Sequence, residues 1–119
     1  MTLVDTSMWV DHLRRGNARV AGLLESGEVA VHPFVLGELA CGNIKNRKEI
    51  LALLDQLPKA TVAEQNEVLT LVESRRLYGT GIGWVDAHLV ASALLSGTRL
   101  LTLDKALGDA ASLLGVRAE

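Results

Sequence analysis

The sequence predicts an α/β domain of three layers, an α/β/α sandwich whose central sheet is mainly parallel. Three observations lead to this prediction. Short apolar runs of strand length alternate with longer segments whose apolar residues recur at helical spacing. Proline and glycine punctuate the joints, and no repeat or linker divides the chain. The length of 119 residues fits one domain and is short for two, so we expect a single domain over residues 1–119.

The first elements follow from apolar runs and the signals that end them. Residues 2–5 predict a short buried strand. Ser7 is placed to cap a helix that continues to Arg15, where basic side chains suit the negative end of the helix dipole. A second helix stops at Gly27, and residues 28–32 form the next β-like run. The chain therefore begins with a strand, two helices and a second strand.

The middle of the chain is predicted to be mostly helical. Pro33 opens a helix, because proline is tolerated in the first helical turn. Apolar residues after Asn46 recur at helical spacing until Pro58 ends that helix. Residues 61–63 predict a minor strand, and residues 64–78 predict a helix with one apolar face.

The last third predicts the centre of the fold. A glycine-rich loop at 79–83 leads into residues 84–96, which are apolar on nearly every side and therefore predict a buried central helix. Residues 100–103 predict a buried strand, Asp104 can cap the last helix, and Val116 predicts an additional edge strand. In such sheets, sites form outside the carboxyl ends of the strands.

Composition excludes several classes of protein. The net charge is −2, so a nucleic-acid substrate would need a local basic track rather than a uniformly basic surface. Cys41 is the single cysteine, which excludes an internal disulfide and a thiolate zinc cluster, and we expect a buried, inert thiol. No apolar run is long enough to span a membrane and no leader is recognisable, so we expect a cytoplasmic protein with no membrane partner.

Four carboxylates stand alone in apolar surroundings, where charged side chains are rare unless they are paired or bind a metal. They are Asp5, Glu38, Asp86 and Asp104. Two carboxylates about 4 Å apart repel by roughly 4 kcal/mol at an effective dielectric of 20, so gathering four of them requires a counter-charge. Mg²⁺ or Mn²⁺ prefers carboxylate and water oxygens and can activate water against a phosphodiester. The pattern therefore predicts one acidic metal site.

Two hydroxyls and several basic residues are candidates for supporting roles. Ser7 and Thr102 each lie two residues from a site aspartate and could orient carboxylates or metal-bound water. Helix capping by Ser7 and strand packing by Thr102 remain open, as do a capping role for Asp104 and a turn role for Asp5. Weaker candidates could hold the phosphates of a nucleic acid, with solvated helix ends as the alternative: Arg14, Arg15, Lys45 and Arg47.

The chain resembles PIN-domain ribonucleases, and specifically the VapC toxins of bacterial and archaeal toxin-antitoxin pairs. Four stretches carry the resemblance, and together they are highly specific. They are residues 4–11 (Val-Asp-Thr-Ser-Met-Trp-Val-Asp), 32–40 (His-Pro-Phe-Val-Leu-Gly-Glu-Leu-Ala), 79–89 (Gly-Thr-Gly-Ile-Gly-Trp-Val-Asp-Ala-His-Leu) and 101–105 (Leu-Thr-Leu-Asp-Lys). The resemblance runs nearly from end to end.

The resemblance implies a PIN-type parallel α/β/α sandwich that cleaves single-stranded or loop regions of RNA with Mg²⁺ or Mn²⁺. It assigns Asp5, Glu38, Asp86 and Asp104 as metal ligands or water activators, with Ser7 and Thr102 in support. It also implies a cognate antitoxin that obstructs the acidic site, and a homodimer. No acid of the motif is missing, so the resemblance implies an active enzyme.

Two alternatives of other classes remain open. A phospho-accepting receiver domain has similar length and an acidic Mg²⁺ pocket, but this chain lacks the adjacent acid pair expected after the first strand. A noncatalytic interaction module could keep the acids only to receive a basic partner segment. Mass gain from a small phosphodonor would indicate the first alternative, and an absence of divalent binding would favour the second.

Overall fold

The computed structural model describes all of residues 1–119. A parallel sheet lies at the centre of the molecule. Its strands are β1 (Thr2–Val4), β2 (Val29–Ala30) and β3 (Arg99–Leu101), in the order β2-β1-β3. Thr2 lies opposite Val29 on one side and Arg99 on the other. The predicted parallel sheet is confirmed, and β1 ends at its centre, directly before Asp5.

Single bridges widen the sheet at both edges. Leu100 pairs in parallel with Arg117, which confirms the edge strand predicted around Val116. At the other edge Val31 pairs with Lys59. The minor strand predicted over 61–63 is therefore wrong by a few residues, because the chain joins the sheet edge directly after Pro58 ends its helix.

Seven helices surround the sheet. Their bounds are α1 (Thr6–Arg15), α2 (Ala18–Glu25), α3 (Pro33–Cys41), α4 (Arg47–Asp55), α5 (Gln65–Ser74), α6 (Trp84–Ser96) and α7 (Lys105–Leu113). α6 spans the residues predicted for it. α5 ends before the predicted residue 78, because Arg76 adopts a left-handed conformation with φ of 55° that breaks the helix.

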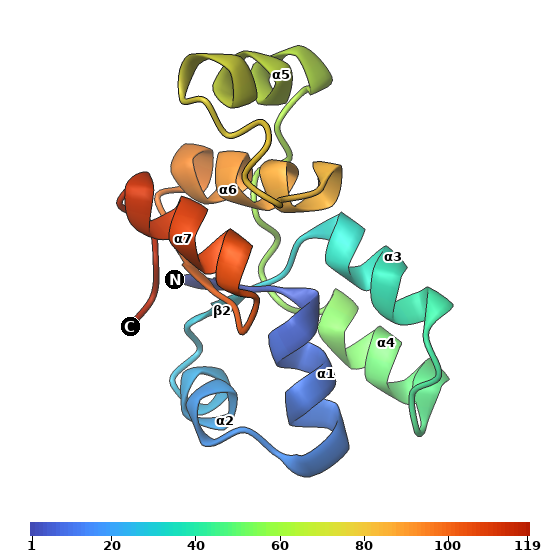
Figure 1. Cartoon of the computed structure of the whole chain (residues 1–119). Coiled ribbons are helices and arrows are strands. Elements are labelled where there is room, and N and C mark those ends of the chain that lie inside the picture. The colour runs from blue at the N-terminus through green and yellow to red at the C-terminus, as the bar shows by residue number, and fades with distance from the viewer.

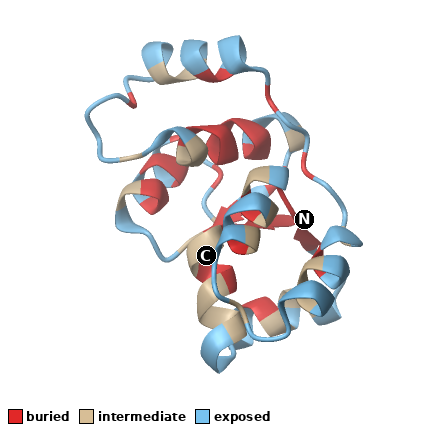
Figure 2. Ribbon diagram, turned by 90° about the vertical axis from the view of Figure 1, so that its right-hand side faces the viewer, coloured by how far each residue is buried: buried red, intermediate tan, exposed pale blue.

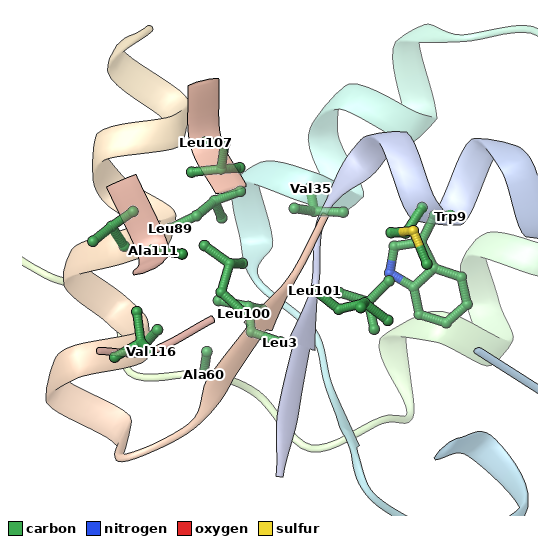
Figure 3. Packing of buried hydrophobic residues seen from close by; sticks show 14 of the residues in the cluster. Leu3, Trp9, Val35, Ala60, Leu89, Leu100, Leu101, Leu107, Ala111 and Val116 are labelled. Carbon is green, nitrogen blue, oxygen red and sulfur yellow. The ribbon is translucent and has the colours of Figure 1, made fainter. Parts of the chain in front are cut away.

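The helices pack on both faces of the sheet, as the predicted sandwich requires (Figure 1). Leu100 and Leu101 point to opposite faces, since side chains alternate along a strand. Figure 3 shows Leu100 toward Leu89 and Ala111 of α6 and α7, and Leu101 toward Trp9 of α1. All five residues belong to one cluster of 21 buried residues, so the two faces share a continuous core.

α5 is an outer element that packs on α6. Ala63, Val68, Ala87 and Ala91 form a small second cluster between these helices. Figure 2 shows α5 largely exposed and α6 largely buried, in agreement with the prediction of a buried central helix. None of the helices is both long and apolar enough to cross a membrane.

Two expectations about individual positions were wrong. Cys41 is exposed rather than buried, because it is the last residue of α3 and lies outside the face that packs on the core. Leu103 is 58% exposed, since β3 ends at Leu101 and the chain has already left the sheet.

Candidate acidic active site

Asp5 lies at the carboxyl end of the central strand and is 4% exposed. Its Oδ1 accepts hydrogen bonds from Ser7 Oγ at 2.7 Å and from the Met8 N–H at 3.0 Å. Thr102 Oγ1 donates to Oδ2. Asp5 is therefore the N-cap of α1, and the prediction that Ser7 caps this helix was wrong, because Ser7 lies inside its first turn.

Asp86 and Asp104 sit at the starts of two helices that cover the same face of the sheet. Asp86 Oδ2 accepts from the Gly83 N–H at 3.1 Å in the first turn of α6. Asp104 Oδ2 accepts from the Leu107 N–H at 2.9 Å and caps α7. Each aspartate uses one oxygen in the helix start and keeps Oδ1 free of protein hydrogen bonds, so capping and a further role are compatible.

Glu38 reaches the same region from the middle of α3 and is exposed. Thr6 Oγ1 donates a hydrogen bond of 2.5 Å to Glu38 Oε1. Thr6, the first residue of α1, thus links this helix to the carboxylate of Glu38 on α3. Sequence reasoning did not single out Thr6, although it stands in the 4–11 stretch that carries the family resemblance.

The four carboxylates share one electrostatic environment. Burial raises the pKa of Asp86 above 3.8, and repulsion from Asp104, Asp5 and Glu38 raises it further. Burial likewise raises the pKa of Asp5, against the lowering effect of its hydrogen bonds from Thr102, Met8 and Ser7. Asp5, Glu38 and Asp104 therefore lie near enough to Asp86 to raise its pKa, although the four acids come from distant segments of the chain.

The donor set fits a hard divalent cation in chemistry but does not form a closed cage. No three of the carboxylates approach closely enough in this arrangement to coordinate one ion. Mg²⁺ keeps several of its waters and takes only one or two protein carboxylates in many sites, so a loose ring of oxygens suits it better than a full cage would.

We expect Asp86→Asn to raise the thermal stability of the metal-free protein at neutral pH. An acid whose pKa is raised on folding stabilises the fold while protonated, and this contribution is lost as pH rises from 3.8 through the raised pKa. The amide removes the charge that is unfavourable there. Melting in EDTA, followed by circular dichroism, measures the effect, with Asp55→Asn on α4 as the matched control. A lower melting temperature than wild type would contradict the electrostatic account.

Hydrogen bonds of Ser7 and Thr102 connect the start of α1 to the loop before α7. Ser7 Oγ accepts from the Leu103 N–H at 3.0 Å and lies 3.4 Å from Thr102 Oγ1. Thr102 Oγ1 accepts from the Asp104 N–H at 2.9 Å while donating to Asp5. The two hydroxyls thereby fix the positions of two site aspartates relative to one another.

A groove of about 340 Å³ opens beside Glu38, between α1 and the loop after α3. Arg14 and Lys45 line it, together with Thr6. The other two candidate RNA contacts are held locally: Arg15 pairs with Asp11 at 2.6 Å, and Arg47 donates to the Ala40 carbonyl at 3.0 and 2.7 Å. The groove therefore brings two of the four predicted basic residues close to Glu38.

The PIN-domain family matches residues 2–113, nearly the whole chain. A crystal structure of PAE2754 from Pyrobaculum aerophilum has a similar fold, with a TM-score of 0.61 and 18% identity over 97% of this chain and 88% of that one. The chain therefore belongs to the PIN-domain family.

Two curated relatives narrow the assignment. Both are named Ribonuclease VapC32, from two strains of Mycobacterium tuberculosis, and each is 50% identical over 117 residues. The alignments cover 98% of this chain and 94% of each relative. Within the PIN-domain family the chain thus groups with the VapC ribonucleases, which confirms the resemblance seen in the sequence.

Proposed function

We propose that Asp5, Glu38, Asp86 and Asp104 form the metal-dependent centre at which this VapC-type toxin hydrolyses RNA. As a VapC-type PIN protein, the chain is an endoribonuclease of a toxin-antitoxin pair. The assignment of the site is supported by the environment of Asp86, whose pKa is raised by burial and raised further by repulsion from Asp104, Asp5 and Glu38. Four carboxylates without a basic partner are a suitable environment for Mg²⁺ or Mn²⁺.

A divalent ion bound here would supply a polarised phosphoryl oxygen and a water of lowered pKa. Asp5 would hold it most rigidly, because three hydrogen bonds fix its carboxylate. Asp86 is the best placed base, since its Oδ1 is free and its raised pKa favours uptake of a proton from the attacking water. Glu38 and Asp104 would complete the ring from the exposed side.

The test is cleavage of single-stranded RNA by the purified chain with and without divalent metal. We expect cleavage with Mg²⁺ or Mn²⁺, loss of cleavage in EDTA and recovery when the metal is restored in excess. Cleavage that persists unchanged in EDTA would overturn the proposal. Calorimetric titration with Mn²⁺ adds a readout independent of activity, and no binding there would favour the noncatalytic interaction module.

Thr102→Val is expected to lower activity or metal affinity by about 10- to 100-fold, the usual range for groups that orient metal ligands. Valine keeps the shape of the side chain but removes the hydroxyl that donates to Asp5 and accepts from the Asp104 N–H. Metal titration and cleavage rate measure the effect. A variant with wild-type values in both would show that Thr102 only packs the strand.

The remaining expectations about partners and location are also proposals. VapC toxins pair with VapB antitoxins and bind RNA, and we propose an antitoxin partner, a homodimer and a cytoplasmic location for this chain. An apolar groove of about 300 Å³ between α1, α2 and α4 supports the first two, because it offers uncovered apolar area to a partner chain. Leu53 at this groove is 59% exposed.

A further inference from the structure

A second basic cavity adjoins the acidic site on the side away from Glu38. It has a volume of about 440 Å³, and its charged lining residues are Arg19, Arg117 and Glu119, with the hydroxyls of Thr102 and Ser112 beside them. Thr102 also donates to Asp5, so the wall of the cavity and the acidic site share a residue. Sequence reasoning did not single out this cavity, because its two arginines come from opposite ends of the chain.

The position of Arg117 is set by its main-chain pairing at the sheet edge and by the space that Gly108 leaves for its side chain. Its main chain pairs with Leu100 at the sheet edge, and its Nη1 lies 3.3 Å from Ser112 Oγ. Gly108 of α7 leaves the space that the guanidinium occupies, since a Cβ there would lie 3.1 Å from Arg117 Cζ. A glycine inside a helix is unfavourable for the helix itself, and here it makes room for a charged group.

Neither Arg19 nor Arg117 forms an ion pair in a structure with four such pairs elsewhere. Glu119 also lines the cavity, but its carboxylate forms an ion pair with neither arginine. Two unpaired guanidinium groups on one cavity wall create a site for an anion. Guanidinium suits phosphate in particular, because its planar fork can donate two parallel hydrogen bonds to phosphate oxygens.

The two basic cavities lie on opposite sides of the start of α1. Thr6, Val10 and Arg14 line the groove beside Glu38 and follow each other at four-residue spacing, which places them on one face of the helix. Met8 lines the cavity of Arg19 and Arg117 and lies on the opposite face. Asp5 caps α1 between the two cavities. A chain of phosphates bound in both would therefore cross the acids.

We propose that Arg19 and Arg117 bind a backbone phosphate of the RNA on the other side of the scissile bond from the Arg14 and Lys45 groove. The inference rests on the proposed ribonuclease function and extends it. The RNA is then held at two phosphate subsites, one on each side of the acids. Such a path from one cavity to the other suits a single strand.

The first test measures binding rather than cleavage, so that it does not depend on the metal. A short fluorescent single-stranded RNA of random sequence is titrated in EDTA at several salt concentrations. Each phosphate contact to a single strand contributes about 0.7 to the slope of log affinity against log salt. We expect Arg19→Ala and Arg117→Ala each to lower the slope by about that amount, and the double variant by about twice as much.

Arg75→Ala is the matched control, because it removes the same charge from the end of α5. It is expected to keep the wild-type slope, and Arg117→Lys is expected to keep most of the slope that Arg117→Ala loses. Equal slopes for wild type and the double variant would overturn the proposal. The same result would follow if the cavity served a protein partner instead of RNA.

A second test locates the contact along the substrate. A single methylphosphonate linkage, which lacks the phosphate charge, is moved along an RNA that wild type cleaves. We expect that, at one linkage distant from the cleavage site, the methylphosphonate slows cleavage by wild type but has no further effect on the Arg19→Ala/Arg117→Ala double variant. If wild type does not cleave with metal, the proposed function fails; if it cleaves and no such position exists, only the second phosphate subsite fails.

Discussion

Asp5→Asn is expected to reduce RNA cleavage by at least about 100-fold, the upper end of what replacing a group that merely orients a ligand costs. The substitution keeps the size of the side chain and removes its charge. Asp5 is the most constrained of the four acids, with Ser7 and the Met8 N–H on one oxygen and Thr102 on the other. A cation held by this carboxylate would lose its most firmly positioned ligand.

The fold is expected to survive this change, because asparagine is as good an N-cap as aspartate and can still accept from the Met8 N–H. Single-turnover cleavage at saturating Mg²⁺ measures the effect, and circular dichroism verifies the fold. Asp55→Asn is the control, since Asp55 is exposed at the end of α4 and pairs only with Lys59. Wild-type cleavage by a folded Asp5→Asn protein would remove Asp5 from the centre.

The local parts of this arrangement could be predicted because they depend on local chemistry. An apolar segment without a polar face predicted α6, and an aspartate before an apolar stripe predicted the cap of α7. The four candidate acids were singled out because each interrupts an apolar run, and because strand ends of a parallel sheet meet at one edge. No distance between these acids followed from the sequence, since it depends on how α3 and α6 pack.

The failures share a physical cause, which is competition between neighbouring groups for the same partner. Ser7 and Asp5 are both good N-caps, and the backbone entering from β1 placed Asp5 at the helix start. Arg15 and Arg47 looked free in the sequence, but each found an acceptor within one or two helical turns.

His32 shows most clearly how a residue set aside from its sequence acquires a structural role. His12, His32 and His88 have no regular spacing in the sequence that would predict a metal site. His32 is fully buried, and its Nδ1 accepts from the Phe34 N–H at 3.0 Å, so it caps α3, the helix that carries Glu38. Its Nε2 is buried without a partner. A protonated ring would lose the cap, because Nδ1 could no longer accept.

We therefore expect acid to destabilise the protein largely through His32. Burial, with repulsion from His88, lowers the pKa of His32 from 6.5 to about 4. Between these values the unfolded chain binds more protons than the folded one, so stability is full above 6.5 and is lost as pH falls toward 4. At 1.36 kcal/mol for each unit, the loss is about 3 kcal/mol.

Urea unfolding at several pH values, in EDTA, compares wild type with His32→Asn. Asparagine can still cap α3 but does not titrate, so the variant is expected to lose about 3 kcal/mol less than wild type on acidification, whatever its stability at neutral pH. The raised pKa values of Asp5 and Asp86 act in the opposite direction in both proteins and cancel in the comparison. Identical pH profiles for the two proteins would show that the buried imidazole does not control acid stability. A difference of the expected size would show that protonation of His32 loosens the start of α3, the helix that carries Glu38.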